Sequence, residues 1–355
     1  MTINASLLKQ IPKPLLSWYD REKRVLPWRE NKDPYRVWVS EIMLQQTRVE
    51  AVIDYYNRFL KLFPTVEALA EAPTEQVLKA WEGLGYYSRA RNLQKAAQMV
   101  VSDYNGIFPK IAKELLKLPG IGRYTAGAVS SIAYDSQEPA VDGNVLRVIM
   151  RILACDENVS KDSVKTEVEE IVRGIIPARA GDFNQSLMEL GALVCLPNGA
   201  PLCEKCPLAE LCEGRRQGIA EQLPNKTQKK ERTIEQKTVF VIEKDGRAAL
   251  RKREEKGLLA GMWEFPNCVG ALDEKQAKEK LASWGISGEM SKLESAVHIF
   301  THREWHMSAY FVHAQGTKDA PFVWADEKEL KEQLTVPAAF SAFVRQLKAE
   351  WRKRK

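Results

Sequence analysis

The stretch 118-LPGIGRYTAGAVSSIAYDSQEPAVD-142 joins two segments of helical periodicity and indicates how the first part of the chain folds. Pro119, Gly120 and Gly122 mark a short turn, and both glycines allow a positive φ and leave no side chain over the turn. The backbone N–H groups there, and those that open the next helix at Arg123, can face an anion such as a nucleic-acid phosphate. An ordinary helical hairpin has the same pattern, because short glycine motifs are weak evidence by themselves.

Helical periodicity recurs on both sides of this turn, from residue 6 to residue 215. The periodic segments are residues 15–24, 35–47, 51–63, 74–84, 90–104, 112–118, 123–133, 144–153, 165–175 and 182–195. Short loops with Pro, Gly, Asn or Asp separate them. The sequence therefore predicts an all-α domain over residues 1–225, with a helix-hairpin-helix at about 113–134.

After residue 225 the pattern changes. Residues 226–236 are polar and basic and are typical of a linker. Residues 237–253 alternate like two strands around a Lys-Asp-Gly turn. Further strands are expected in residues 298–314 and 322–326, and helices in residues 272–285 and 327–334. The sequence predicts an α+β domain over residues 237–355, with a core separate from that of the helical domain.

Composition and charge exclude some classes of protein. Hydrophobic residues make up 45% of the chain and charged residues 28%, which is ordinary for a globular protein. No apolar run approaches the ~18 residues of a membrane span, and the first residues do not resemble a signal peptide. Residues 1–225 contain 28 basic and 28 acidic residues, and residues 226–355 contain 25 and 19. Net charge therefore says little about nucleic-acid binding by the helical domain, and we expect a cytoplasmic protein.

Four of the six cysteines form a cluster at the end of the helical domain: Cys195, Cys203, Cys206 and Cys212. Without a signal sequence, such a cluster favours a metal site over disulfides. Four thiolates this close in sequence can bind a [4Fe–4S] cluster or a zinc ion. Because the cysteines are contiguous, we expect a structural role. The isolated Cys155 and Cys268 are expected to be buried.

Glu41 is the first of two candidate catalytic carboxylates. Its neighbours at helical spacing include Val37, Trp38 and Leu44. Poor solvation would raise its pKa and keep it protonated, as a general acid requires. The alternative is a half-exposed glutamate at the edge of an apolar helix face.

Asp142 is the second carboxylate, and it is followed by Gly143 and Asn144. An aspartate before an apolar helix is a common N-cap, and a cap can also be functional. The helix dipole favours the ionised form there. One protonated and one ionised carboxylate form the pair that cleavage of a glycosidic bond requires.

Several of these motifs resemble known DNA glycosylases. The segment LPGIGRYTAGAV resembles the helix-hairpin-helix of the endonuclease III superfamily, VDGNVLRV resembles its aspartate motif, and the cysteines resemble its [4Fe–4S] loop. Within the superfamily, WVSEIMLQQT and WEGLGYYSRARNL resemble the MutY-type adenine DNA glycosylases, which remove adenine mispaired with 8-oxoguanine. The resemblance covers essentially the whole chain. It implies one [4Fe–4S] cluster, although this chain has seven residues between its first two cysteines where the family pattern has six.

The resemblance also implies roles for individual residues. Glu41 would protonate adenine at N7, and Asp142 would stabilise the sugar cation, supported by Tyr124 and Asn144. Superfamily members that also cut the strand have a lysine where this chain has Tyr124. Further positions are implied to contact the adenine (Trp28, Arg29, Leu44, Gln185) or the DNA (Gln46, Thr47, Tyr86, Gly120, Gly122). Taken alone, the two aromatic residues would more often be core residues, and Gln46 a surface residue.

The C-terminal part resembles the Nudix-like domain that recognises 8-oxoguanine in this family. Residues 257–266 resemble the start of a Nudix signature, but residues 276–286 lack its paired acidic residues, so we do not expect nucleotide hydrolysis. Phe300, Thr301 and His302 fall where the family has a Phe-Ser-His recognition loop. Threonine keeps the hydroxyl and adds a methyl group.

These features predict a monofunctional glycosylase that flips out and removes adenine paired with 8-oxoguanine or guanine in double-stranded DNA. We expect a monomer in the cytoplasm, associated with the nucleoid. One alternative is a bifunctional pyrimidine-lesion glycosylase and lyase, and the missing lysine at position 124 argues against it. Another is a non-catalytic protein that binds damaged DNA, in which Glu41→Gln would leave behaviour unchanged.

Overall fold

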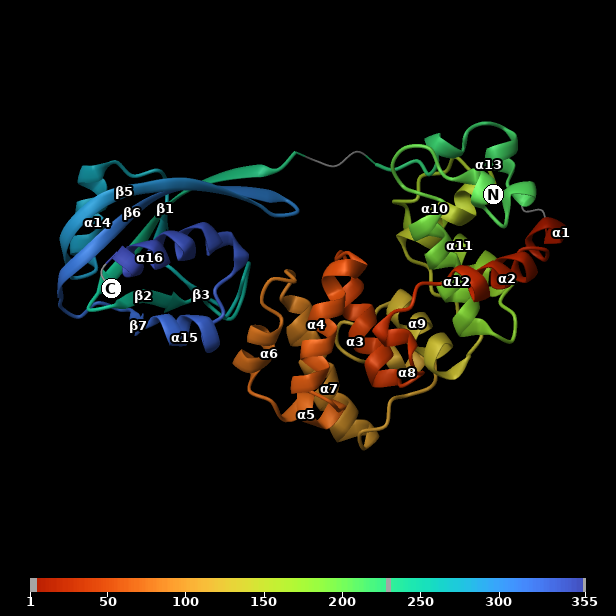
Figure 1. Ribbon diagram of the computed structural model, residues 1–355, viewed down its shortest axis with the longest axis horizontal. Helices are drawn as coiled ribbons and strands as arrows, with labels where there is room; N and C mark the ends of the chain where they lie inside the picture. Colours follow the sequence, from red (N-terminus) through yellow and green to blue (C-terminus); the bar gives the residue numbers. More distant parts are fainter. Residues whose placement is uncertain (1–4, 228–230, 354–355) are drawn as a thin grey trace. The chain divides into compact units, whose positions relative to one another are not determined.

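A computed structural model describes residues 5–227 and 231–353 (Figure 1). The chain divides into two compact units, one of residues Met1–Ala72 and Arg91–Gln228, the other of Pro73–Ala90 and Lys229–Lys355. Residues 228–230, in the predicted linker, lie outside the described residues. Among those described, none of the helices combines the length and apolar character that crossing a bilayer requires.

The first unit is helical and contains no strand among its described residues. Its longer elements are α2 (Pro12–Glu22), α3 (Pro34–Leu44), α4 (Val49–Leu62), α9 (Arg123–Tyr134), α10 (Gly143–Ile152), α11 (Asp162–Arg173) and α12 (Ala180–Leu193). Shorter helices are α1 (Ala5–Leu8), η1 (Pro27–Arg29), α5 (Val66–Glu71), α8 (Ala112–Leu115), η2 (Cys203–Lys205), η3 (Ala209–Leu211), α13 (Glu213–Arg216) and η4 (Ala220–Gln222). Helix α7 (Ser88–Tyr104) begins in the second unit and continues into the first.

Helix α3 is the central helix around which the first site is built. Its N-cap Asp33 accepts hydrogen bonds from the backbone N–H groups of Tyr35 and Arg36, and Pro34 occupies the first turn, where no N–H is needed. Every residue from Tyr35 to Met43 except Arg36 is buried, and the helix packs against α4 and α9. A helix that is buried on nearly all sides places any polar residue it carries, Glu41 included, away from water.

The second unit contains a mixed sheet with a helix on each face. Its elements are β1 (Thr233–Lys244), β2 (Arg247–Lys252), β3 (Trp263–Glu264), β4 (Asn267–Val269), α14 (Glu274–Ser283), β5 (Ile286–Ile299), β6 (Arg303–Thr317), β7 (Val323–Ala325), α15 (Glu327–Glu332), η5 (Ala338–Phe340) and α16 (Ser341–Lys353). The main strand order is β3-β2-β1-β6-β5, with β4 on β1 and β7 on β2. Among the described strands, β1 and β6 pair in parallel and the other pairs are antiparallel.

The central strand β1 is buried on both faces over residues 237–243, which agrees with the apolar run at residues 239–242. Val239 and Val241 pack with α16 in one core cluster, and Phe240 and Ile242 pack with α14 in another. The predicted turn between β1 and β2 is confirmed. Asp245 and Gly246 both have a positive φ, as a tight two-residue hairpin requires.

Residues 73–90, including α6 (Thr74–Ala80), belong to the second unit although the sequence placed them in the helical domain. The Lys79 ammonium donates to the carbonyl oxygens of Leu330 (3.3 Å) and Leu334 (3.0 Å), and to Glu82 Oε2 (2.7 Å). Glu82 Oε1 in turn accepts from the Val336 N–H at 3.0 Å. These bonds pair backbone groups at the end of α15 and in the segment after it. Local sequence patterns cannot reveal such contacts, because the partners are distant in sequence.

Candidate active site and cysteine-lined cavity

Glu41 and Tyr124 form the centre of the candidate active site. Glu41 lies on α3 and is 6% exposed, and the Tyr124 hydroxyl on α9 donates a hydrogen bond to its Oε2. Burial raises the pKa of Glu41 to about 7, although the hydrogen bond from Tyr124 opposes this shift and the nearby Asp142 adds to it. Burial also raises the pKa of Tyr124 well above its ordinary value. Glu41 is therefore a buried carboxyl that can hold a proton near neutral pH, as the sequence predicted.

Asp142 is the N-cap of α10 and lies next to this pair. Its Oδ1 accepts from the N–H groups of Asn144 (2.9 Å) and Val145 (2.8 Å), and its Oδ2 accepts from the Asn144 side-chain amide at 2.7 Å. Burial raises the pKa of Asp142, and these three donors act in the opposite direction because they favour the ionised form. Asp142 thus caps α10 and lies close enough to Glu41 to affect the pKa of that carboxyl, while its chemical role stays a prediction.

Arg147 links this carboxylate to the cysteine loop, a role that the sequence analysis does not predict. Its Nη2 donates to Asn144 Oδ1 at 3.0 Å and to the Gly191 carbonyl at 2.8 Å, while its Nε donates to the Cys195 carbonyl at 2.8 Å. Arg147 is 4% exposed. An arginine on an apolar helix can be recognised as paired only when the neighbouring elements are placed, so its spacing alone could not predict this role.

The residues implied to contact adenine lie on three elements of the first unit. Trp28, on η1, is buried and packs edge to face with Tyr56 at 5.4 Å between ring centroids. Its neighbour Arg29 donates from Nε to Gln185 Oε1 on α12 at 3.1 Å. Leu44 is the partly buried last residue of α3. The structure thus brings Arg29 and Gln185 into contact.

The turn at residues 118–122 separates α8 from α9. Gly120 has φ +78°, and a Cβ built there would lie 2.7 Å from the Asn92 Cβ. Gly122 has φ −98°, so of the two glycines only Gly120 uses the positive φ that both allow. Gly122 is instead the exposed N-cap of α9, with no atom within 4 Å of a built Cβ. Only Gly120 is required by the backbone, while Gly122 leaves the N-terminus of α9 open to an approaching group.

The two glycines should therefore respond differently to substitution. We expect Gly120→Ala to lower the free energy of unfolding by about 1–3 kcal/mol, because alanine is strained in the left-handed region. Gly122→Ala should cost less than about 1 kcal/mol, since it changes only the cap residue. Urea titration followed by far-UV circular dichroism measures both. Equal losses would contradict this assignment.

Two residues implied to contact DNA have left-handed backbones. Gln46 has φ 60° and is exposed after the end of α3, and Tyr86 has φ 47° and is 48% exposed. Such conformations are uncommon for residues other than glycine and often occur at functional sites. The Thr47 side chain donates to the Gln45 carbonyl at 3.4 Å.

The predicted recognition loop is the turn between β5 and β6 in the second unit. Phe300 packs its ring against Trp305 (4.8 Å between centroids) and donates its N–H to the Arg303 carbonyl. Thr301 and His302 are exposed at the tip. The hydroxyl groups of Thr301 and Tyr86 lie 2.9 Å apart and share a hydrogen bond. Phe300 therefore anchors a turn that presents the other two side chains to solvent.

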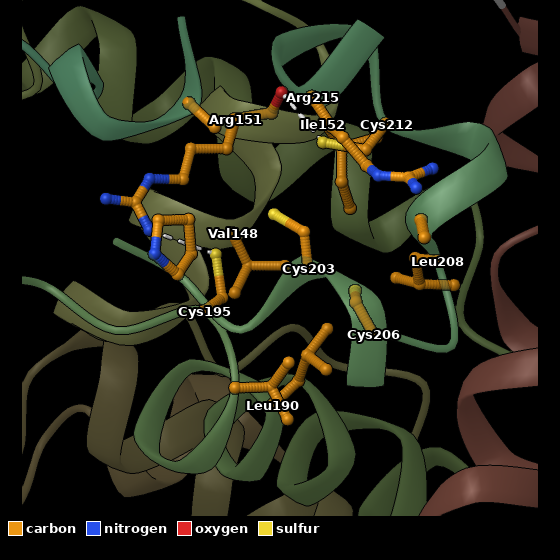
Figure 2. Close-up of a pocket in the computed structure, with 14 residues that line it drawn as sticks. Val148, Arg151, Ile152, Leu190, Cys195, Cys203, Cys206, Leu208, Cys212 and Arg215 are labelled. Carbon is orange, nitrogen blue, oxygen red and sulfur yellow. Dashed lines mark hydrogen bonds between the residues drawn. The ribbon is translucent and has the colours of Figure 1, made fainter. Parts of the chain in front are cut away.

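The four clustered cysteines line one cavity of the first unit, together with apolar residues of α10 and α12 (Figure 2). None of them forms a disulfide. The Arg151 Nη1 donates to Cys195 Sγ at 3.3 Å, and Cys212 Sγ donates to the Arg151 carbonyl at 3.4 Å. Burial raises the pKa of Cys206 to about 12, and the other cysteines add to this shift. A cationic centre would favour their thiolate forms, so this donor set fits a cluster held by cysteine sulfur. Among the described residues, no three possible ligands are placed to hold a single metal ion.

Comparisons with known proteins identify both domains. Residues 39–174 match the model of the HhH-GPD superfamily of base excision DNA repair proteins, and residues 238–346 match the NUDIX domain. A solved thermostable thymine-DNA glycosylase is 30% identical with a TM-score of 0.54, over 60% of this chain and 98% of that one. The structure of a non-covalent endonuclease III–DNA complex is 28% identical with a TM-score of 0.51, over the same shares. Fold and site thus define a base-excision glycosylase of the helix-hairpin-helix class, followed by a Nudix-like domain, as the sequence predicted.

Relatives identify the family more closely. The adenine DNA glycosylase of Rattus norvegicus is 37% identical over 86% of this chain and 71% of its own length. That of Buchnera aphidicola subsp. Schizaphis graminum is 33% identical over 88% of this chain and 92% of its own length. The chain belongs to the adenine DNA glycosylase family.

Proposed function

We propose that this protein hydrolyses the N-glycosidic bond of adenine paired with 8-oxoguanine or guanine in double-stranded DNA and leaves an abasic site. The observation that carries the proposal is the buried Glu41 carboxyl, bonded to Tyr124 and placed beside Asp142. Glu41 can hold a proton, and Asp142 is surrounded by donors that favour its anion. Such a pair of carboxyls suits cleavage of a glycosidic bond.

The residues divide the reaction between them. Glu41 donates its proton to adenine N7, so that the electron pair of the breaking C1′–N9 bond leaves with a neutral base. The Asp142 carboxylate stabilises the positive charge that develops on the sugar. Water then adds to C1′ and loses a proton, which gives free adenine and an abasic site. Asn144 holds Asp142 in place by its two hydrogen bonds.

Tyr124 supports hydrolysis alone, without strand cleavage. A lyase forms a Schiff base with an amine at its nucleophile position. Here that position carries a phenol, which is bonded to Glu41 and whose pKa is raised by burial. We therefore propose a monofunctional enzyme.

We further propose that Phe300, Thr301 and His302 contact the 8-oxoguanine opposite the adenine, and that Gln46 and Tyr86 enter the duplex when adenine is flipped out. The exposed turn tip and the left-handed backbones support these roles. The protein would act as a monomer in the cytoplasm, associated with the nucleoid.

We also propose that Cys195, Cys203, Cys206 and Cys212 hold a [4Fe–4S] cluster. The shared cavity and the absence of disulfides among these four residues support this assignment. When bound, the cluster would cross-link the loop of residues 195–212 to itself beside the apolar residues of α10 and α12 that line the same cavity, and it would not take part in base removal. A brown protein with broad visible absorbance would support it, and a colourless zinc protein would contradict it.

A panel of duplexes tests the proposed reaction. Each duplex carries one labelled strand with A:8-oxoguanine, A:G, A:T or thymine glycol, and is treated with alkali after incubation. We expect alkali-dependent cleavage at adenine in the first two only. Cleavage at thymine glycol, or a borohydride-trapped protein–DNA adduct under conditions that trap a lyase, would favour a bifunctional enzyme. No release of adenine would contradict the proposal.

The pH dependence follows from the two carboxyls. The single-turnover rate should fall by about tenfold per pH unit above the pKa of Glu41, which lies at about 7, because the acid must be protonated. The rate should also fall at low pH, as Asp142 becomes protonated. Because burial raises the pKa of Asp142, this fall should occur at a higher pH than for an ordinary aspartate. Tyr124→Phe removes a hydrogen bond that favours ionised Glu41, so the high-pH limb should move to higher pH. Movement to lower pH would show that the assigned contact is wrong.

A further inference from the structure

Glu189 is a buried acid on α12 to which none of the proposed chemistry assigns a role. It is 1% exposed, and its carboxylate accepts hydrogen bonds from two arginines. Arg24 donates from its backbone N–H (2.9 Å), from Nε (2.8 Å) and from Nη2 (2.9 Å), and Arg29 donates from Nη2 at 2.9 Å. Burial opposes ionisation, but these bonds lower the pKa of Glu189 to about 2. Glu189 is therefore a fixed negative charge at ordinary pH.

Arg29 is held at all three of its nitrogen atoms. Its Nη2 bonds to Glu189, its Nη1 to the Arg24 carbonyl at 3.1 Å, and its Nε to Gln185 Oε1 at 3.1 Å. Its guanidinium also lies over the Tyr19 ring, 5.6 Å from the centroid. A planar guanidinium fixed in this way has one orientation.

That orientation determines the orientation of Gln185. Arginine can only donate, so the amide atom that faces it must be the acceptor Oε1. The amide nitrogen then points elsewhere, and within the described part of the chain its one hydrogen bond is a long 3.4 Å contact with the Gly181 carbonyl. Gln185 thus has a donor with capacity for another acceptor.

We infer that Glu189 is a positioning residue for the base pocket: by holding Arg29, it fixes the direction in which Gln185 presents its amide. The inference rests on the proposed function, because Arg29 and Gln185 are assigned to the adenine pocket there. Adenine has several ring-nitrogen acceptors that such a donor can meet. Without the carboxylate, Arg29 loses one of three anchors and the amide can turn over.

A double-mutant cycle tests this coupling. Single-turnover release of adenine from A:8-oxoguanine duplex is measured for the wild type, Glu189→Gln, Gln185→Ala and the double variant. We expect Glu189→Gln to slow release by up to about 100-fold, as loss of substrate positioning does. Because both residues act through one orientation, the double variant should be no slower than the slower single variant.

A control removes an ion pair elsewhere in the same unit. Glu138→Gln breaks the 2.7 Å contact with Arg173 and should leave the rate unchanged. If Glu189→Gln does not fold, as judged by circular dichroism, Glu189→Asp replaces it in the cycle, since it keeps the charge but withdraws it by one methylene group.

The possible results separate the inference from the proposed function. A wild type that releases no adenine contradicts the function itself. If the wild type is active but the two substitutions slow it independently, so that their effects multiply in the double variant, the inference is overturned. A Glu189→Gln enzyme that is as fast as the wild type overturns it as well. A lower melting temperature with an unchanged rate would assign Glu189 to stability alone.

Discussion

Replacing Glu41 by glutamine is expected to slow adenine release by about 10²- to 10⁴-fold, the range typical of a lost general acid. Glutamine has nearly the same shape and can still accept the hydrogen bond that Tyr124 donates to this side chain. It has no acidic proton, so the base must leave as an anion. Single-turnover kinetics on A:8-oxoguanine duplex measures the loss, and a gel-shift titration should show unchanged affinity for that duplex.

Stability gives this variant a second signature. The pKa of Glu41 is raised from 4.5 to about 7 by burial, so its contribution to the stability of the wild type is complete below pH 4.5 and is lost as pH rises through about 7. Glutamine stays neutral, so Glu41→Gln should be the more stable protein above pH 7. The exposed Glu50→Gln on α4 is the control: it should leave the rate unchanged and, because Glu50 lies in the first turn of its helix, lower the stability by less than about 1 kcal/mol with no change between pH 6 and 8. A Glu41→Gln enzyme with the wild-type rate would leave the protein without its proposed acid.

The sequence predicted most elements whose patterns are local. Helix α9, the cap at Asp142 and the β1–β2 hairpin follow from spacing and turn chemistry. Strand β5 was recognised only at its end, because much of it is exposed and lacks alternation. Helix α16 is not among the predicted elements, although Phe343, Leu347 and Trp351 recur at a spacing of four residues and are buried. That signal was present in the sequence.

The site was predictable as residue types but not as a network. Glu41 and Asp142 could be proposed because each stands in a distinctive local context. Arg147 and Glu189 lie on apolar helices, where a charge is tolerated only if partners from other elements reach it. Those partners, Cys195 and Arg24 among them, are distant in sequence. The contacts that orient the site therefore required the tertiary structure.

Replacing Asp142 by asparagine is expected to slow adenine release by about 10²- to 10³-fold, because the sugar cation loses a preorganised negative charge. Asparagine is also a good N-cap, so α10 should keep its first turn and the protein most of its stability. Asp33→Asn is a matched control, since Asp33 caps α3 through two backbone N–H groups in the same way and has no proposed chemical role. The two variants should have similar melting temperatures, and only Asp142→Asn should be slow. If both were equally slow, the rate would depend on helix capping and not on the charge at residue 142.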